Sequence, residues 1–466
     1  MNATKLDKTY GTLRDSLRGA VFLPDDPGYH EIRQVWNRRY DRKPAIIVQA
    51  LGTTDVVRAV EFARDRGLPV SVRSGGHHVS GMGACDEGMM IDMSRMRSVI
   101  VNPETQTAIV QGGATAADVI RETQLFGLAV PTGNIGRVGV AALALGGGMG
   151  YLRRQYGLTC DHLEAADMVL ADGSVVHVSR QHQSELFWAL QGGGGNFGIA
   201  VALYLRLVRV GPTVAGLRVL YSVDDAQAVL AGCRNFLAAS DNAVSINIDI
   251  MAMPPAPGMP PGLVGKTVIS LSGMHAGEAI DGALREIEPL RRLATPLVDA
   301  SGPMSYTALH SILDNMLPAE HQGYVESFYA DTLSDDLIER VAGIMASART
   351  GQILMLWPMG GKVAEPAPEE TAFGDRGAGL VVMVESAWQN PSDQGAGIAW
   401  VRKIRSSLDE FAYNGGTYLN LHDVSQDTEV LKKSYGVNYE RLKTLKRQYD
   451  PDNMFRFNAN INPALP

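Results

Sequence analysis

Residues 69–78 read P-V-S-V-R-S-G-G-H-H, a run typical of a short strand that stops at two glycines and two histidines. Glycine has no Cβ atom, so the main-chain amides of Gly75 and Gly76 can crowd around an anion directly after the strand. Taken by themselves, His77 and His78 are typical of a polar turn, because no cysteine or histidine lies at metal-ligand spacing from them. The surrounding sequence has to decide between these interpretations.

The segment lies in a region where short β-like runs alternate with helices. A β-like run at 45–49 precedes a predicted helix, for which Thr53 or Thr54 is the expected N-cap and Gly67 the expected end. Further β-like runs lie at 89–93, 98–101 and 107–111, and a helix is predicted at 116–126, with Thr115 as its N-cap and Gly127 as its end.

Residues 193–198, G-G-G-N-F-G, match the dinucleotide fingerprint G-x-G-x-x-G. That fingerprint requires a strand before it and a helix after it, so that the diphosphate meets a helix N-terminus. Here the order is reversed, because 185–191 is typical of a helix and the β-branched run 199–210 of a strand. Arg218 also stands where a ribose-binding acid is expected. The sequence therefore argues against a nicotinamide-binding Rossmann domain.

A further glycine cluster, G-G-G-M-G at 146–150, follows the apolar run V-G-V-A-A-L-A-L. Together with Gly75-Gly76 and 193–198 it gives three glycine loops, a set that suits a diphosphate lying along a sheet edge. The alternative is that these loops are tight turns in a β-rich domain.

Length and charge bound the remaining choices. A chain of 466 residues exceeds what one hydrophobic core usually supports, so two or three domains are expected. The formal net charge of -8 argues against a nucleic-acid partner. The N-terminal sequence and the lack of a long apolar run predict a soluble, cytoplasmic protein that does not contact membranes. The three widely spaced cysteines argue against a disulfide framework.

A domain boundary is expected at Gly211-Pro212, where the β-branched run stops. The middle segment, 213–411, has a different character, with helices predicted at 276–293 and 334–348, a β-like run at 379–385, and proline-rich loops at 254–262 and 364–370. Near the C-terminus, Lys443 to Arg447 lie on a predicted helix, and their charges are expected to form a solvated face.

Six strings of this sequence, in the same order, resemble the FAD-linked oxidases of the vanillyl-alcohol-oxidase type, and within them the berberine-bridge-enzyme-like branch. The resemblance spans nearly the whole chain. Besides 69–78, the strings are G-R-V-G-V-A-A-L-A-L-G-G-G-M-G-Y-L at 136–152, Y-G-L-T-C-D-H-L at 156–163, L-F-W-A-L-Q-G-G-G-G-N-F-G-I at 186–199, Y-L-N at 418–420 and Y-D-P-D-N-M-F-R-F-N-A-N-I at 449–461.

The resemblance implies an α+β fold of two domains. Residues 1–212 and 412–466 would form the FAD domain, and 213–411 a substrate domain whose antiparallel sheet, covered by helices, roofs the flavin ring. In the family the histidine at the position of His77 bonds to the 8α-methyl carbon of FAD. The other implied cofactor-binding positions are Arg73, Ser74, Gly75, Gly76, His78, Gly133, Val138, Gly139, Gly147, Gly148, Gly150, Tyr151, Gly195, Asn196, Gly198, Ile199, Tyr418, Asn420 and Asn458.

Two positions of the family pattern bear on the type of link and on oxygen. Many relatives make a second bond to the flavin from a cysteine two residues after the glycine that is Gly133 here, but this chain has Ile135 there. An isoleucine cannot add to the ring, so a single covalent link is expected, as in the mono-covalent members of the branch; Cys85 and Cys160 do not occupy this position. Val138 maps to the position that governs oxygen approach, where a compact side chain goes with oxidase behaviour, although it can equally be a packing residue.

The residues that would act on the substrate are less sharply defined. Tyr418 matches the flavin-facing tyrosine of the family and is the candidate for base or substrate orienter, with neither role favoured. Glu385 is either a pocket carboxylate or a solvated strand-end acid, and the second interpretation is the more common for such a residue. Trp357, Trp388 and His275 are either pocket walls or core residues.

The expected activity is oxidation of a C–OH or C–N carbon of a small organic or secondary-metabolite substrate, by hydride transfer to flavin N5, with O2 as acceptor and H2O2 as product. The alternatives are a dehydrogenase or oxygenating flavoenzyme of natural-product biosynthesis and a non-catalytic flavin-binding protein. No metal is expected, and the chain is expected to be a monomer or a homodimer.

Overall fold

The computed structural model describes residues 3–255, 261–316, 320–423 and 428–464. Part of the proline-rich segment 254–262 therefore lies outside the described residues. The N-terminal part begins with α1 (Ala3–Ser16) and α2 (Tyr29–Ile32). Its four-stranded sheet has the order β1-β2-β4-β3, with β1 (Ala20–Phe22), β2 (Ile46–Gln49), β3 (Val70–Arg73) and β4 (Met89–Asp92).

This first sheet is parallel except for β1, and α3 (Thr53–Arg64) packs against it through Val56, Ala59 and Val60. The helix starts at Thr53, but its N-cap is Gly52, so the expected threonine cap is wrong by one residue. Gly67 closes the turn that follows, with its N–H donating to the carbonyl of Arg64, as predicted.

A second sheet of five antiparallel strands has the order β5-β6-β10-β8-β9. The helix predicted at 116–126 has Thr115 as its N-cap, in a capping box with Asp118, and Gly127 ends the 3-10 turn that extends this helix. The elements are β5 (Val99–Asn102), β6 (Thr107–Gln111), α4 (Ala116–Thr123), β7 (Leu128–Ala129), α5 (Val140–Leu145), α6 (Arg153–Tyr156), β8 (Leu163–Val169), β9 (Val175–Ser179), α7 (Ser184–Leu190), β10 (Ile199–Arg206) and β11 (Val208–Arg209). Because α7 precedes the loop 193–198 and β10 follows it, the rejection of a Rossmann fingerprint is confirmed.

The third sheet is antiparallel and is built entirely from strands between residues 213 and 387, in the order β15-β12-β14-β13-β18-β19-β17, with β16 beside β12. Its elements are β12 (Thr213–Ser222), α8 (Ala226–Ala239), β13 (Val244–Ala252), β14 (Thr267–His275), α9 (Ile280–Ile287), β15 (Val298–Asp299), β16 (Gly302–Ser305), α10 (Tyr306–Met316), β17 (Gly323–Ala330), α11 (Asp335–Met345), β18 (Gln352–Pro358), β19 (Leu380–Ala387) and α12 (Gln394–Ser407).

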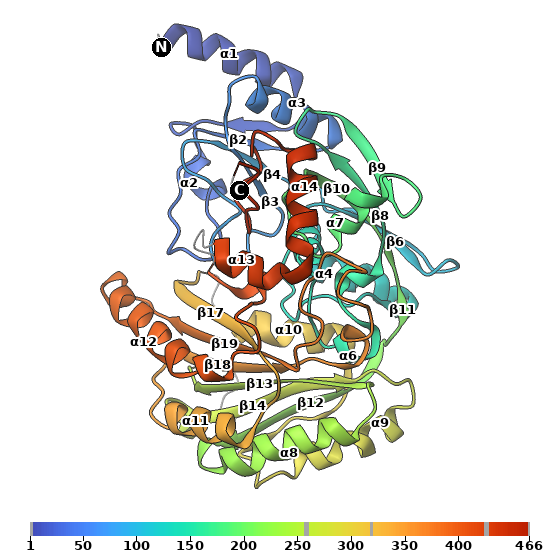
Figure 1. The fold of residues 1–466 in the computed structure, drawn as a ribbon, viewed down its shortest axis with the longest axis vertical. Coiled ribbons are helices and arrows are strands. Elements are labelled where there is room, and N and C mark those ends of the chain that lie inside the picture. Colours follow the sequence, from blue (N-terminus) through green and yellow to red (C-terminus); the bar gives the residue numbers. More distant parts are fainter. Residues whose placement is uncertain (1–2, 256–260, 317–319, 424–427, 465–466) are drawn as a thin grey trace.

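The two faces of this sheet have different neighbours. Figure 1 shows α8, α9 and α11 on the side turned away from β3 and α14, and their apolar residues share a core with Ile246, Ile248 and Ile250 of β13. Side chains alternate along a strand, so Asn247 and Asp249 point to the opposite face, toward the first two sheets. The antiparallel sheet therefore presents polar groups to the rest of the chain.

The chain end returns to the N-terminal half as α13 (Thr428–Tyr435) and α14 (Tyr439–Tyr449). The expectation of a solvated charged face on α14 is wrong for Lys443 and Lys446, which are both buried. The Lys446 ammonium contacts Asp450 at 2.6 Å and donates to the carbonyls of Asn196 and Phe455, both at 2.9 Å. The lysine thus joins the glycine loop 193–198 to the C-terminal segment.

The Lys446→Met variant is expected to lose about 3 kcal/mol of unfolding free energy, because Asp450 would remain buried without its cation. Denaturant unfolding followed by tryptophan fluorescence measures this loss. Lys432→Met is the control, since Lys432 forms an exposed pair with Glu429 and should matter little. Equal losses in the two variants would contradict a structural role for the buried pair.

Among the helices that the structure describes, none is both long enough and apolar enough to cross a membrane. The cysteines Cys85, Cys160 and Cys233 are all free and buried.

Candidate functional site

The loop that carries His77 leaves the parallel sheet at Arg73. The guanidinium of Arg73 pairs with Asp92 at 2.9 Å and donates to the carbonyls of Ile32 and Gln34, so its side chain fixes the strand end. The next residue, Ser74, donates its hydroxyl to the carbonyl of Gly112 at 2.6 Å. The loop is therefore held from the strand side before it reaches the histidines.

Two glycines allow this loop to touch the segment 133–139. A Cβ atom on Gly75 would lie 2.4 Å from the amide nitrogen of Gly139, and one on Gly139 would lie 2.2 Å from the Ser74 hydroxyl. Val138 and Ile135 are half-buried on the second segment. At Gly133 a Cβ would make only ordinary contacts, with Leu143 at 3.5 Å and the carbonyl oxygen of Met149 at 3.9 Å.

The loop 146–150 lies against the Y-L-N string. The N–H of Gly148 (φ +88°) donates to the Tyr418 hydroxyl at 3.1 Å, and the Asn420 amide donates to the same oxygen at 3.0 Å. Burial raises the pKa of Tyr418 to about 12. Because this hydroxyl already accepts two N–H bonds and is hard to ionise, its own hydrogen remains available for donation. The geometry favours Tyr418 as an orienter over Tyr418 as a base.

The neighbouring glycines of this loop are sterically required. A Cβ on Gly150 would lie 1.7 Å from the carbonyl oxygen of Thr132, and Gly147 has a φ of +108° beside Phe373. The next residue, Tyr151, is buried and its hydroxyl lies 3.3 Å from that of Ser272 on β14. The loop is thus fixed from both the first half of the chain and the antiparallel sheet.

In residues 193–199, most of the positions expected to bind the cofactor have structural roles within the protein. Asn196 is fully used, since it donates to the carbonyls of Gly193 and Ala459 and accepts from the N–H of Ile461. Gly198 (φ +153°) precedes β10, and the buried Ile199 is the first residue of that strand. Asn458 differs, because its amide donates to the Gly195 carbonyl at 3.0 Å while its Oδ1 is buried without a partner among the described residues.

The electrostatics of the two histidines keep both rings neutral. Burial, together with the nearby charges of Arg137 and His321, lowers the pKa of His77 to about 3, and burial lowers that of His78 to about 4. The Nδ1 atom of His78 accepts from the N–H of Ser80 at 3.1 Å. In contrast, Nε2 of His77 is buried and meets no hydrogen-bond partner in the part of the chain that the structure describes.

The antiparallel sheet contributes a carboxylate that the sequence interpretation missed. Asp249 lies opposite Met355 of β18, and Met355 and Trp357 pack with Tyr418 in one apolar cluster. The Oδ1 atom of Asp249 is buried and makes no hydrogen bond to another described residue. Burial raises the pKa of Asp249 to about 7, an effect opposed by Trp357 and Arg153 and reinforced by Glu385.

Arg153 ties this face to the glycine loop 146–150. Its guanidinium donates to Asn247 at 2.9 Å, to the Ile246 carbonyl at 2.5 Å and to the Gly150 carbonyl at 3.0 Å. The loop and the strand that carries Asp249 are therefore one connected unit.

Comparison with known proteins identifies this arrangement. A family model described as an FAD binding domain matches residues 44–179, and one described as berberine and berberine like matches residues 417–462. The FAD-linked oxidoreductase YgaK of Bacillus subtilis is 30% identical over 466 residues, covering 97% of this chain and 98% of the relative. The chain belongs to the berberine-like FAD-linked oxidoreductases.

The relatives of this FAD-linked oxidoreductase include oxidases and solved structures. (R)-6-hydroxynicotine oxidase of Paenarthrobacter nicotinovorans is 28% identical, with 96% of this chain and 97% of the relative covered. The structure of 6-hydroxy-D-nicotine oxidase from Arthrobacter nicotinovorans superposes with a TM-score of 0.86 at 27% identity, covering 96% of this chain and 98% of that one. These findings confirm the resemblance, the mixed α+β fold with its helix-covered antiparallel sheet, and the assignment as an FAD-dependent oxidoreductase.

The site of this FAD-linked oxidoreductase fits its cofactor. Buried polar atoms normally have hydrogen-bond partners, so those without one indicate where a ligand supplies the bond. Within the described part of the chain, such atoms occur at Nε2 of His77, at both amide atoms of Asn134 and at Oδ1 of Asn458. A Cβ would also clash at Gly75, Gly139 and Gly150, which leaves bare main chain along these loops.

The structure decides the surroundings of three residues for which the sequence left two interpretations open. Trp388 packs with the residues of α12 in the core between the antiparallel sheet and its helices, here called the helix-side core, which contradicts its interpretation as a pocket wall. Trp357 packs with Tyr418, as a wall residue would. Glu385 is not a solvated acid, because its side chain is 14% exposed and lies 3.1 Å from Nε2 of His321.

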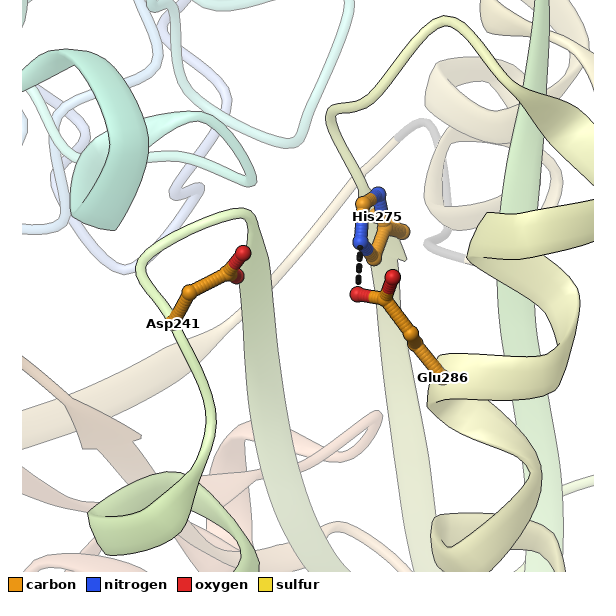
Figure 2. Close-up of side chains that lie close together, drawn as sticks. All are labelled: Asp241, His275 and Glu286. Carbon is orange, nitrogen blue, oxygen red and sulfur yellow. Dashed lines mark hydrogen bonds and ion pairs between the residues drawn. The ribbon is translucent and has the colours of Figure 1, made fainter.

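His275 belongs to a cluster with Asp241 and Glu286, whose possible ligand atoms lie within 4.8 Å of one another (Figure 2). The N–H of Gly277 donates to Nδ1 of His275 at 2.9 Å, so Nε2 carries the ring hydrogen and donates it to Glu286 at 2.7 Å. A metal ligand needs a free nitrogen lone pair, and neither nitrogen offers one in this arrangement. We therefore interpret the cluster as a hydrogen-bonded contact between β14 and α9.

Proposed function

We propose that this FAD-linked oxidoreductase is an oxidase that holds FAD through a single covalent bond to His77. The observation that carries the proposal is the environment of that imidazole. The ring is neutral and half-buried, it lies on the glycine loop that follows a parallel strand, and its buried Nε2 has no hydrogen-bond partner among the described residues. A neutral imidazole nitrogen is the form that can act as a nucleophile. No cysteine stands at Ile135 to supply a second link.

In this proposal the cofactor is bound by the loops of residues 1–212 together with 412–466, while 213–411 forms the substrate domain. The diphosphate and ribityl chain would contact main-chain amides of the three glycine loops. The binding set is Arg73, Ser74, Gly75, Gly76, His77, His78, Gly133, Val138, Gly139, Gly147, Gly148, Gly150, Tyr151, Gly195, Asn196, Gly198, Ile199, Tyr418, Asn420 and Asn458.

The substrate is proposed to be a small organic molecule that is oxidised at a C–OH or C–N carbon. Bound FAD supplies the hydride acceptor for this chemistry. Tyr418 donates its hydroxyl hydrogen to the substrate and orients it, whereas Asp249 accepts the proton from the substrate O–H or N–H. A general base works best when its pKa lies near the working pH, which fits Asp249 and not Tyr418. The name of the 6-hydroxynicotine oxidase relative supports a small-molecule substrate with a C–N bond.

Oxygen is proposed as the electron acceptor, because Val138 offers a compact, half-exposed side chain on the segment that touches the His77 loop. The test needs no substrate. Flavin-loaded protein is reduced anaerobically with dithionite and then mixed with air-saturated buffer. An oxidase is expected to regain its flavin absorbance rapidly and to release one H2O2 per flavin. Reoxidation as slow as that of a dehydrogenase, without stoichiometric peroxide, would contradict the proposal.

A further inference from the structure

His77 is the outer ring of a stack of three aromatic rings. The indole of Trp36 lies parallel to the His77 imidazole, with ring centroids 4.1 Å apart and an interplanar angle of 14°. The other face of the same indole lies on His321, with centroids 4.1 Å apart and an angle of 3°. Both faces of Trp36 are therefore covered by imidazole rings.

The main chain around Trp36 is held on both sides of the stack. The N–H of Trp36 donates to the carbonyl of Gly76 at 2.9 Å, and its carbonyl accepts from the N–H of His321 at 3.2 Å. The amide of Asn37 donates to the carbonyls of Val79 at 2.6 Å and Gly323 at 3.0 Å. The segment is thus clamped between the His77 loop and the residues that lead into β17.

The far end of the stack is fixed by the antiparallel sheet. His321 is buried, and its Nε2 lies 3.1 Å from Glu385 of β19. A strand of the sheet therefore holds the ring of His321, and the Trp36 indole packs between the rings of His321 and His77. The pairing with His321 accounts for the low exposure of the Glu385 side chain, which is 14%.

We propose that Trp36 is a positioning residue for covalent flavin attachment, holding the His77 ring in one orientation while His321 and Glu385 hold the indole. The inference rests on the proposed link through His77. In the attachment reaction an N–C bond forms while the imidazole N–H and one C–H of the 8α-methyl group break. The two electrons and two protons released pass to O2, which leaves as H2O2.

Stacking matters because little else fixes the orientation of the His77 ring. Nε2 of His77 has no hydrogen-bond partner in the described chain, so hydrogen bonds at that atom do not set the rotation of the imidazole. Parallel stacking on the indole restricts the plane of the His77 ring and covers one of its two faces. Displacing a reacting group by about 1 Å can cost on the order of 100-fold in rate, so loss of the stack should slow attachment strongly.

The test measures the covalent fraction, which is the flavin that stays with acid-precipitated protein divided by total bound flavin. Trp36→Leu, which keeps apolar bulk but removes the ring, is expected to slow covalent incorporation of added FAD about tenfold or more. Trp36→Phe restores a flat ring and is expected to recover most of the rate. Total FAD binding by filtration should change much less than the covalent fraction.

Trp388→Leu is the matched control, because it removes the same side chain from the helix-side core and should lower thermal stability without lowering the covalent fraction. If Trp36→Leu attaches FAD as fast as the native sequence, or if Trp36→Phe is as slow as Trp36→Leu, the positioning role is wrong. If the native sequence itself holds FAD without any covalent fraction, the proposed function fails instead, so the two failures are distinguishable.

Discussion

Replacing Asp249 by Asn is expected to lower turnover by about 10²–10⁴-fold, the range in which a positioned general base contributes. The isosteric amide keeps the shape of the side chain beside Met355 but cannot accept a substrate proton. The measurement is anaerobic flavin reduction by any small alcohol or amine that bleaches the native protein. Asp241→Asn is the control, because Asp241 is exposed and caps a turn at Ala243.

The pH dependence gives a second and independent readout for Asp249. Since its pKa is raised to about 7, the native rate of flavin reduction should rise as pH increases through about 7 and then level off. The folded state binds this proton more tightly than the unfolded state. As pH rises from the ordinary pKa of an aspartate through about 7, Asp249 therefore progressively lowers the free energy of unfolding. The Asn variant should lack this loss, and the native melting temperature should approach that of the variant at acid pH. An unchanged pH–rate profile in Asp249→Asn would exclude it as the base.

Replacing His77 by Ala is expected to abolish covalent flavin entirely. Position 135 holds isoleucine instead of a cysteine that could form a second link, and Nδ1 of the neighbouring His78 accepts a hydrogen bond from the N–H of Ser80. The variant should release all flavin on acid precipitation, and its band on a denaturing gel should show no flavin fluorescence. His78→Ala, the matched control, should keep a fluorescent band. A yellow acid pellet from His77→Ala would place the attachment elsewhere in the chain.

Local sequence signals predicted the loops of this site well. The strand before His77, the N-cap at Thr115 and the helix–loop–strand order around 193–198 all depend on residues close in sequence, where glycine, capping and periodicity rules apply. The family resemblance then supplied the cofactor and the two-part fold, which no local pattern contains.

The missed features depend on contacts between distant segments. Asp249 stands in S-I-N-I-D-I-M at 245–251, whose alternating isoleucines could have shown that the carboxylate faces away from the apolar layer. Its raised pKa, however, follows from burial against β18, which pattern reading cannot place. The stack of Trp36 between His77 and His321 joins three segments, and the burial of Lys446 reflects the packing of α14 onto the loop of Asn196. Helical periodicity alone had predicted that Lys446 lies on the surface.

The mass of the intact, acid-denatured native protein tests the central claim most directly. After loading with FAD and removal of free flavin, the denatured chain is expected to be heavier by one FAD less two hydrogens, and the tryptic peptide that contains His77 to carry this added mass. A denatured chain with the mass of its 466 residues alone, and all of the flavin in the supernatant, would contradict the account.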